Sequence, residues 1–510
     1  MEERVLDARG LMPPEPLNLT LEAIDTLQPG ERLRLLIHRT PHMLYPILQE
    51  WGFAYLTRTA DDGTYEVLIW RRQDGAEPAP PGTGMNQPGL SLDQAPPILV
   101  PLRFFFTAPL FASLVSVLAL WQGPELLASR WNPPLLAATH LLTLGFLGMV
   151  MIGALLQMLP VVAGAPVKRP RLVAWVVHVL ACAGVLLLGC GFAFDHSLPL
   201  KPAMLLLGTG LLLFSTVIVL SLRRALAGNP TASAMRLAAV ALAATVMLGL
   251  VLASNHAWGW WLPGARDSVT NLHLTWGLLG WVGLLVTGVA YQTVPMFQLT
   301  PDYPPMLTRW LPKSLFVVLA ALPLALLFPV LQPVFGLLLA AGYSTFAAMT
   351  LRLQMKRRRK LADIPLAFWR VAMSSILLSA ALWLAGQIFP EFGSGNTYGL
   401  LLGFTMIVGF AMTLVNGMLY RIVPFLIWFH LQSQRKAGAR NVPNVKAILP
   451  ERRCRGQMWL HFATLALLAA AVMRPQPFVY PAAAAFGVSN LWLLLNLYSA
   501  YRVYRRLSVA

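Results

Sequence analysis

Three related stretches decide the fold of this chain: GFLGMVMIGALLQMLP at residues 145–160, GWVGLLVTGVAYQTVP at 280–295 and GFAMTLVNGMLYRIVP at 409–424. The first two share three glycines, a glutamine and a proline at the same spacings. The third follows after a slightly shorter interval and keeps Gly409, Gly417 and Pro424, with Met412 and Arg421 at the other two positions. An interval of about 130 residues holds roughly four membrane-spanning helices with their loops. The recurrence therefore predicts three units of four helices each.

The composition is that of an integral membrane protein. Apolar residues make up 57% of the chain and charged residues 12%, and the mean hydropathy is +0.61, outside the range of soluble domains. We expect an all-α polytopic membrane domain over residues 98–510, because twelve apolar stretches are long enough to cross a bilayer. They lie near 98–121, 135–161, 171–193, 199–222, 234–254, 269–296, 311–328, 331–351, 367–389, 397–425, 457–473 and 478–502.

The Lys and Arg residues gather in alternate loops, which predicts the orientation because cytoplasmic loops are enriched in them. With the N-terminus inside, the cytoplasmic loops hold Lys168 to Arg171, Arg223 and Arg224, Lys356 to Lys360, Arg435 to Arg455 and Arg502 to Arg506. We therefore expect a multi-pass protein of the bacterial inner membrane with both termini in the cytoplasm. The polar first 97 residues carry 14 of the 21 acidic residues and predict no cleavable signal peptide. The net charge of +18 is expected to face lipid headgroups rather than nucleic acid.

Residues 1–75 have the pattern of a separate α/β domain with the order βαβαββ. Val5 to Ala8 and Arg32 to Ile37 are predicted strands, and helices are expected from Pro16 to Leu27 and from Thr40-Pro41 to about Trp51. Two further strands flank the turn at Asp61-Asp62-Gly63. Residues 76–97, rich in Pro, Gly and Ala, are expected to be a flexible linker to the first span.

The segments LDARGLMPPEPL, LQPGERLRLLI and HRTPHMLYPILQEWGF resemble the small two-layer fold of TusA-type (SirA-like) sulfur carriers. That family has a reactive Cys before Pro-x-Pro, and here Pro13 stands in its place. No thiolate can form there, so the resemblance implies a docking, sensing or regulatory module. His38 and His42 lie near the second predicted helix and are more consistent with surface or capping residues than with a metal site.

The membrane region lacks the buried carboxylates of an ion-coupled transporter. Past residue 97 there are seven acidic residues, and each falls in a loop or at a helix end. Cysteine chemistry is equally sparse, since no Cys-x-x-Cys pattern occurs and Cys182 and Cys190 lie roughly 12 Å apart along one helix.

Histidine is the chemically distinctive residue at membrane depth. His140 and His273 each lie a few residues inside a span that runs from outside to inside, at the head of the first two repeated stretches. Polar groups in hydrocarbon face the bundle interior, and haem iron is commonly held by His within packed helices. The pair predicts a haem or metal site, with hydrogen bonding to a neighbouring helix as the alternative. His256 beside Trp258, Trp260 and Trp261 instead suggests an interfacial aromatic belt.

Twelve helices in three units, with a His early in the second and sixth spans, resemble the catalytic subunit of haem-copper oxidases and its NnrS-like relatives. The resemblance implies that His140 is a haem ligand, that His273 is a copper or haem ligand, and that Arg474 pairs with a haem propionate. The seventh span lacks the His pair for copper, and the tenth, TYGLLLGFTMIVGFAMTLVNGMLY, lacks the haem-ligating histidines. A complete oxygen- or nitric-oxide-reducing centre is therefore not expected.

The sequence thus favours a degenerate, oxidase-like protein that binds haem, with copper as the other metal considered. By analogy it would act in respiratory or nitric-oxide-stress (denitrification) physiology, beside a respiratory or denitrification membrane complex. Two alternatives stay open. One is a transporter of a small, sulfur-containing solute with a cytoplasmic regulatory module. Glycine-rich helices in corresponding positions of the repeats favour this alternative. The other is a cofactor-free scaffold for membrane-complex assembly.

Overall fold

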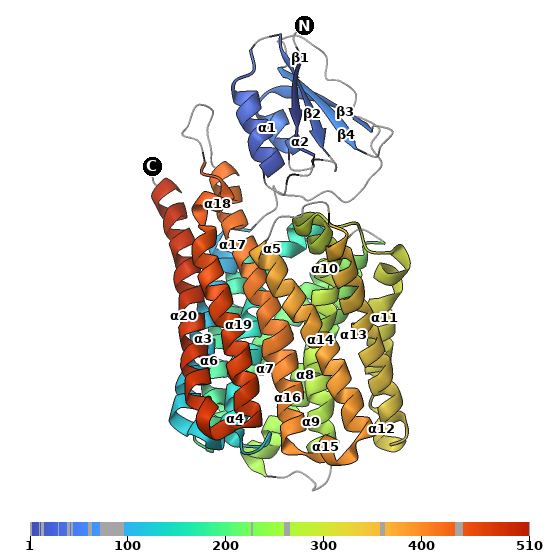
Figure 1. The fold of residues 1–510 in the computed structure, drawn as a ribbon, viewed down its shortest axis with the longest axis vertical. Coiled ribbons are helices and arrows are strands. Elements are labelled where there is room, and N and C mark those ends of the chain that lie inside the picture. Colours follow the sequence, from blue (N-terminus) through green and yellow to red (C-terminus); the bar gives the residue numbers. More distant parts are fainter. Residues whose placement is uncertain are drawn as a thin grey trace.

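The computed structural model describes residues 3–9, 11, 15–28, 30–37, 41, 44–59, 64–71, 96–225, 228–259, 266–357, 363–433 and 442–508. A small α/β domain lies over one end of a long helical bundle, and the C-terminal helix ends at the same end (Figure 1). This is called the N-domain end below, and the opposite end is called the far end. Pro13, His38, His42, the Asp61–Gly63 turn and most of the predicted linker lie outside the described residues.

The N-terminal domain has the predicted βαβαββ order. Its elements are β1 (Glu3–Asp7), α1 (Glu15–Asp25), β2 (Arg32–Ile37), α2 (Leu44–Glu50), β3 (Phe53–Thr59) and β4 (Tyr65–Arg71). The sheet order is β1-β2-β4-β3, with β1 parallel to β2 and the other pairs antiparallel. Alternate strand residues such as Leu33, Leu35, Val67 and Ile69 are fully buried, as expected for a sheet covered on one face.

Twelve helices in the described part of the chain are long and apolar enough to cross a membrane. The first unit contains α3 (Leu99–Gln122), the helix formed by α4 (Pro133–His140), η3 (Leu141–Gly148) and α5 (Met149–Ala163), then α6 (Pro170–Ala193) and α7 (Leu200–Leu222). The second contains α8 (Pro230–Trp258), the helix formed by α9 (Arg266–Thr275), η4 (Trp276–Gly283) and α10 (Leu284–Gln298), then α11 (Pro305–Ala321) with α12 (Leu324–Leu327), and α13 (Leu331–Met355). The third contains α14 (Ile364–Ile388), the helix formed by α16 (Asn396–Phe404), η5 (Thr405–Met412) and α17 (Thr413–Ser433), then α19 (Glu451–Met473) and α20 (Pro475–Ser508).

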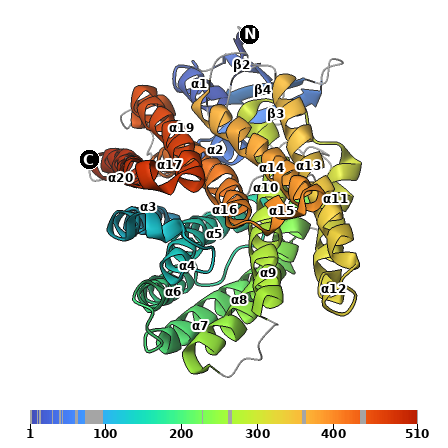
Figure 2. The same ribbon diagram turned by 60° about the horizontal axis from the view of Figure 1, so that its bottom comes forward.

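The three units form a closed ring. The last helix of each unit packs on the first helix of the next, as α7 on α8 and α13 on α14, and α20 closes the ring on α3 (Figure 2). Because each unit has four spans, all three begin at the same end of the bundle. The repeats are therefore parallel, and they are related by a pseudo-threefold arrangement, as the sequence predicts, rather than by inversion.

The second helix of each unit lies at the centre of the ring. In each of these three helices, 61–72% of the most apolar 18-residue stretch is buried inside the protein. In each of the other spans, at most 50% of the corresponding stretch is buried. η5 contacts both η3 and η4, so the three helices meet. The repeated sequence stretches lie on these central helices.

Each central helix contains a π-helical segment, and the three segments are spaced like the sequence repeat. They cover Leu141–Gly148, Trp276–Gly283 and Thr405–Met412, and each begins four positions before the first glycine of its repeated stretch. Such turns are rare and frequently lie at functional sites. Side-chain hydroxyl groups donate to carbonyls inside two of these segments: Thr413 Oγ1 donates to the carbonyl of Val408 at 2.8 Å, and the Tyr343 hydroxyl donates to that of Leu279.

Candidate functional site

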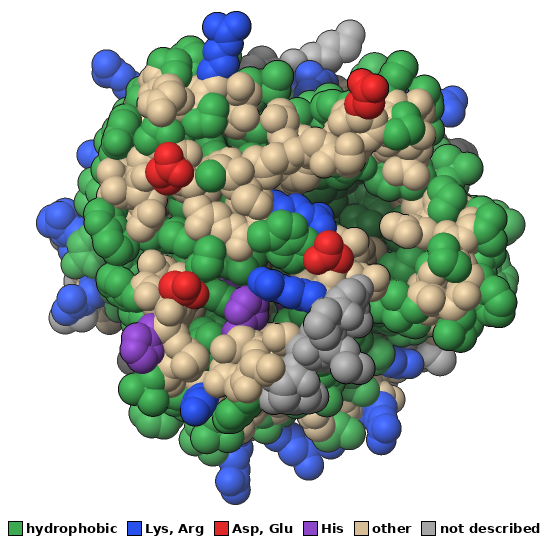
Figure 3. Space-filling model, turned by 90° about the horizontal axis from the view of Figure 1, so that it is seen from below, with side chains coloured by type: hydrophobic (Ala, Val, Ile, Leu, Met, Phe, Trp, Pro, Cys, Tyr) green, Lys and Arg blue, Asp and Glu red, His purple; other side chains and the backbone are tan. Residues whose placement is uncertain are grey.

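A cavity of about 1400 Å³ lies inside the ring toward the far end. All three units contribute to its wall, including residues of each π-helical segment such as Leu142, Trp281 and Phe410. Loop residues that connect spans at the far end, such as Trp131 and Gly395, also line it. Viewed from the far end, the surface is hollowed, with basic, acidic and His side chains beside the hollow (Figure 3). The cavity is larger than the usual range of small-molecule pockets, whose upper end is about 1000 Å³.

His140 and His273 both line this cavity. His140 lies five residues before Gly145 and His273 lies seven residues before Gly280, so the two lie within one helical turn of the same depth. Their ring centroids are 6.3 Å apart, and the ring planes differ by 27°. The structure therefore brings the two predicted residues together.

Backbone carbonyls fix both imidazoles in the same tautomer. Nδ1 of His140 is 2.8 Å from the carbonyl oxygen of Leu136, one turn earlier in its own helix, and Nδ1 of His273 is 3.0 Å from that of Thr245 on α8. A carbonyl only accepts, so each Nδ1 carries the proton and each Nε2 keeps its lone pair. Neither Nε2 has a hydrogen-bond partner among the described residues. This is the arrangement seen in metal-ligating histidines, whose other ring nitrogen donates to a carbonyl.

A third histidine stands beside the pair. Phe192 stacks on His140 with centroids 5.5 Å apart, and it packs at a right angle to the ring of His256 with centroids 5.4 Å apart. The Nε2 of His256 lies 3.2 Å from a guanidinium nitrogen of Arg266. His256 is at the end of α8, near the interface as predicted, but its ring belongs to the cavity wall. Of its expected aromatic neighbours, Trp258 is exposed, and Trp260 and Trp261 lie outside the described residues.

Two arginines flank Trp131 at the far end of the cavity. The guanidinium of Arg130 lies 4.4 Å from the centroid of the Trp131 ring, and that of Arg266 lies 5.5 Å from it. Both arginines line the cavity, and neither has a carboxylate partner within the described ranges. The arrangement leaves positive charge available to an anionic group.

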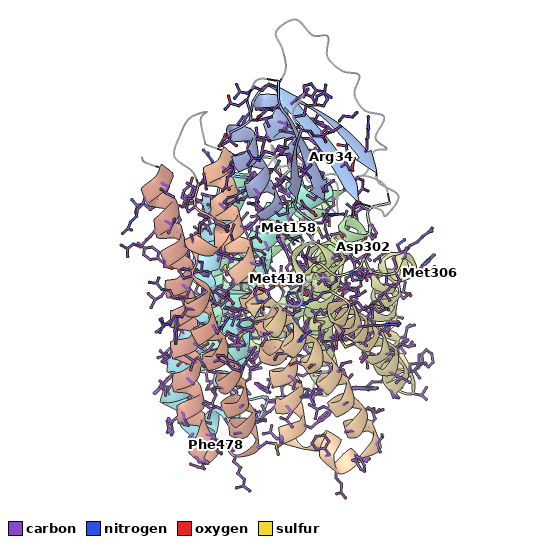
Figure 4. All side chains as sticks on the ribbon, turned by 45° about the horizontal axis from the view of Figure 1, so that its top comes forward. Arg34, Met158, Asp302, Met306, Met418 and Phe478 are labelled. Carbon is purple, nitrogen blue, oxygen red and sulfur yellow. The ribbon has the colours of Figure 1, made fainter. Side chains whose placement is uncertain are left out.

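Arg474 does not join this site. It caps the end of α19, is exposed, and is not among the residues that line the cavity. The methionines near the first repeat are also separate from it. Met149 and Met151 are buried in packing, and Met158 lies in the half of the bundle nearer the N-terminal domain, as Met418 does, away from Phe478 at the far end (Figure 4).

A weak signal in the sequence marks two of the site residues that were missed. Arg130 lies three residues before α4 and fifteen before Gly145, and Arg266 is the first described residue of α9 and lies fourteen before Gly280. That recurrence is visible in the sequence, whereas the approach of His256 depends on how α8 packs on α9. Within the described part of the chain, no three His, Cys, Asp or Glu side chains gather as a metal site.

Fold and site together define a multi-pass membrane protein built as a ring of three parallel four-helix units around a histidine-lined cavity. Residues 5–71 match the model of a family described as uncharacterized conserved protein (DUF2249). This match covers the N-terminal domain and leaves the membrane region without a family name. No curated protein matches the chain.

Proposed function

We propose that this protein binds haem in the far-end cavity, with His140 and His273 as the iron ligands. The observation that supports this proposal most directly is the pair of imidazoles. They share one tautomer, and their unpartnered Nε2 atoms line one cavity. Ligation of one ion by both Nε2 atoms, with metal–nitrogen distances of about 2.0–2.1 Å, would place the two imidazole centroids at most roughly 6 Å apart. The observed separation of 6.3 Å fits that span.

The donor set favours haem over a bare metal ion. Protein copper and zinc sites take three or four protein ligands, whereas haem iron needs only one or two because the porphyrin supplies the rest. Two histidines and no third His, Cys, Asp or Glu ligand in the described residues fit the second case. The wall is mainly apolar, and Arg130 and Arg266 can pair with the carboxylates of a porphyrin.

Bound haem would supply one-electron transfer, because the porphyrin and the two histidines would leave the iron no open position. Apolar residues of the three central helices would keep water from the iron, and the carbonyls of Leu136 and Thr245 would hold the two ligand rings in place. We place the protein in the bacterial inner membrane, with the N-terminal domain in the cytoplasm. Its role would be in respiratory or nitric-oxide-stress (denitrification) physiology, beside a membrane complex and without an oxygen-reducing centre of its own.

Absorption and electron paramagnetic resonance spectra of the full-length protein, purified from haem-sufficient cells, test the proposal. We expect a Soret band and a low-spin ferric signal. His140→Ala and His273→Ala should each convert the haem to high spin or release it, because each removes one of the two proposed ligands. His196→Ala is the matched control, since His196 is exposed outside the cavity, and its spectra should equal those of the parent.

The same preparation separates the other possibilities. Stoichiometric copper without a Soret band would show that the two histidines bind copper and not haem. A folded protein with neither haem nor metal would overturn the proposal and leave the scaffold or the transporter. The parallel repeats described above do not supply the inverted architecture that would have favoured a transporter.

A further inference from the structure

The cavity continues away from the histidines into a space between the second and third units. We call this space the side branch and define it by six residues that line it, Gly336, Leu339 and Ala340 on α13 and Ser379, Ala380 and Trp383 on α14. On each helix these residues are three and four positions apart, so they share one helix face. None of the residues proposed above to hold haem lies on α13 or α14.

Small side chains leave room between the two helices. Trp383 packs directly on Gly336, where an added Cβ would overlap the indole ring. Because α13 and α14 are antiparallel, Ala340 and Ala380 lie at one level, a turn deeper in the bundle, and two alanines fill little of the space between helices. Deeper still, the Tyr343 hydroxyl donates to a carbonyl of η4. The side branch therefore extends from the far end toward the central helix of the second unit.

The side branch is open at the protein surface, unlike the cavity wall at the other two unit boundaries. The described wall residues on α3, α7, α8 and α20 are all buried or half-buried. At the side branch, the wall includes Leu326 of α12, which is 49% exposed, and the exposed residues Gln332 on α13 and Gln387 on α14. The opening therefore lies between the α12–α13 connection and the end of α14, and α12 stands at the outer edge of the ring (Figure 2).

Apolar side chains border this opening on both sides. Phe328 and Val330 beside α12, and Ile388 and Phe389 at the end of α14, are each more than half exposed. Such surface is costly in water and favourable in hydrocarbon. The opening therefore faces lipid.

The charge pattern of the connections agrees with this position. The chain has no Lys, Arg, Asp, Glu or His between Lys313 and Arg352, so the far-end connection between the seventh and eighth spans is uncharged. The other five far-end connections each have a charged residue in them or directly beside them, namely Arg130, Asp195, Arg266, Glu391 and Arg474. The α12–α13 connection is thus the one that can lie within the bilayer at least cost.

Three polar side chains stand at the opening. Gln332 and Gln387 each lie one turn from the contact between Gly336 and Trp383, toward the far end, on facing helices. The hydroxyl of Tyr398 lies beside the residue that precedes Gln387. All three line the cavity, and none has a hydrogen-bond partner in the described part of the chain. Amides and phenols both donate and accept, so the three match an uncharged hydrogen-bonding group.

The charged side chains of the wall are directed elsewhere. In the described ranges they are Arg130, Arg266 and Asp267. Arg130 approaches α16 at Gly399, but its guanidinium lies over the Trp131 ring. The side branch thus combines an apolar interior, a neutral polar opening and access from lipid.

We propose that the side branch binds a lipid-borne amphiphile with an uncharged hydrogen-bonding head and an apolar tail. The molecule enters from the far-end leaflet between the α12–α13 connection and α14. Its head bonds Gln332, Gln387 and Tyr398, and its tail fills the space beside Ala340 and Ala380. This site does not depend on haem, and it gives the cavity a second ligand, drawn from the membrane.

Photo-cross-linking tests the proposal in the full-length protein, reconstituted in lipid nanodiscs. The probe is a monoacylglycerol with a diazirine in the middle of its acyl chain, and mass spectrometry identifies the labelled residues. We expect labelling at Leu339 or Ala340 that unlabelled monoacylglycerol displaces. Ala380→Trp should remove it, because the indole fills the branch. Leu378→Trp is the matched control on the lipid-facing side of the same helix, where Leu378 is 51% exposed, and it should leave the labelling unchanged.

The head group is tested with a second probe, in which the same acyl chain carries an anionic phosphoglycerol head. It should label Leu339 and Ala340 far less than the uncharged probe. The double variant Gln332→Leu with Gln387→Leu should reduce labelling by the uncharged probe about fivefold or more, as expected for two lost hydrogen bonds.

Three results would overturn the proposal: no displaceable labelling at Leu339 or Ala340, equal labelling by both probes, or undiminished labelling in Ala380→Trp or in the double variant. Thermal unfolding verifies that the variants are folded, and Ala340→Phe, read at Leu339 and Ser379, replaces Ala380→Trp if the latter is not. The expected labelling is the same in protein that lacks haem, so failure of the haem proposal is distinguishable from failure of this one.

Discussion

At the scale of the residue, the chemistry of each buried histidine follows from the atom that faces its ring nitrogens. His140 and His273 face backbone carbonyls and keep a free Nε2, whereas Thr413 and Asn416 occupy both nitrogens of His461. The sequence placed His140 and His273 at membrane depth, but it did not reveal the partners of these rings or of His461. The partners belong to other helices for His273 and His461, and only tertiary packing brings them near.

Two arginines allow a matched comparison at this scale. Arg266 lines the cavity, whereas Arg474 is exposed outside it. Under the haem proposal, Arg266→Ala should lower haem affinity roughly tenfold or more, because a charged hydrogen bond contributes about 1.5–3 kcal/mol. Arg474→Ala should leave the affinity unchanged. Haem occupancy during titration with a competing haem-binding protein measures both, and an equal loss in the two variants would remove Arg266 from the site.

At the scale of the element, the repeated glycines explain how each central helix lies against the first helix of its unit. A Cβ on Gly145 or Gly153 would strike Phe111 or Phe104 of α3, and one on Gly280 or Gly288 would strike Ala241 or Ala234 of α8. In the third unit, Gly409 and Gly417 meet Ser375 and Phe368 of α14 in the same way. In all three units the partners are seven residues apart. Small residues allow this close approach of helices in a membrane.

A larger side chain at one of these glycines should therefore destabilise the bundle. Gly288→Leu has no room beside Ala234, and overpacking of this kind costs about 1–3 kcal/mol. Gly403→Ala is the control, because nothing lies within 4 Å of the added Cβ. Thermal unfolding of the purified proteins gives the comparison. A melting temperature for Gly288→Leu equal to that of Gly403→Ala would show that the contact is not a packing constraint.

Among the elements, the spans and the N-terminal strands were predictable because apolar length and two-residue alternation are local properties. The repeat was predictable because glycines and prolines keep their spacing. The π-helical segments were not predictable from the sequence. The repeated glycines Gly145 and Gly280 lie in these segments, but they do not indicate the π-helical hydrogen-bond pattern. The cavity was also beyond sequence reasoning, because its wall comes from helices of all three units.

At the scale of the whole molecule, the ring closes and both described ends of the chain lie at one end of the bundle (Figure 1). The Lys and Arg distribution predicts that this end faces the cytoplasm. Cys454 is nearly fully buried and is a poor reporter of sidedness. Exposed positions at the two ends serve better, namely Ser197 at the far end and Arg452 at the N-domain end.

With the three native cysteines replaced, Ser197→Cys should react with a membrane-impermeant maleimide in intact spheroplasts, and Arg452→Cys only after lysis. The reason is that Ser197 joins spans at the end with few basic residues, while Arg452 lies in a basic loop. Labelling of Arg452→Cys before lysis would reverse the predicted orientation.

The closure of α20 on α3 also sets an order of events during synthesis. Ala482, Ala483 and Phe486 of the last helix form part of the cavity wall, as do Ser116 and Ala119 of the first. The ribosome synthesises α3 first and α20 last among the membrane-spanning helices. The wall of the cavity therefore stays open to lipid on the α3 side until α20 has inserted. A ligand in the cavity is thus enclosed on that side only after translation of the membrane domain is complete.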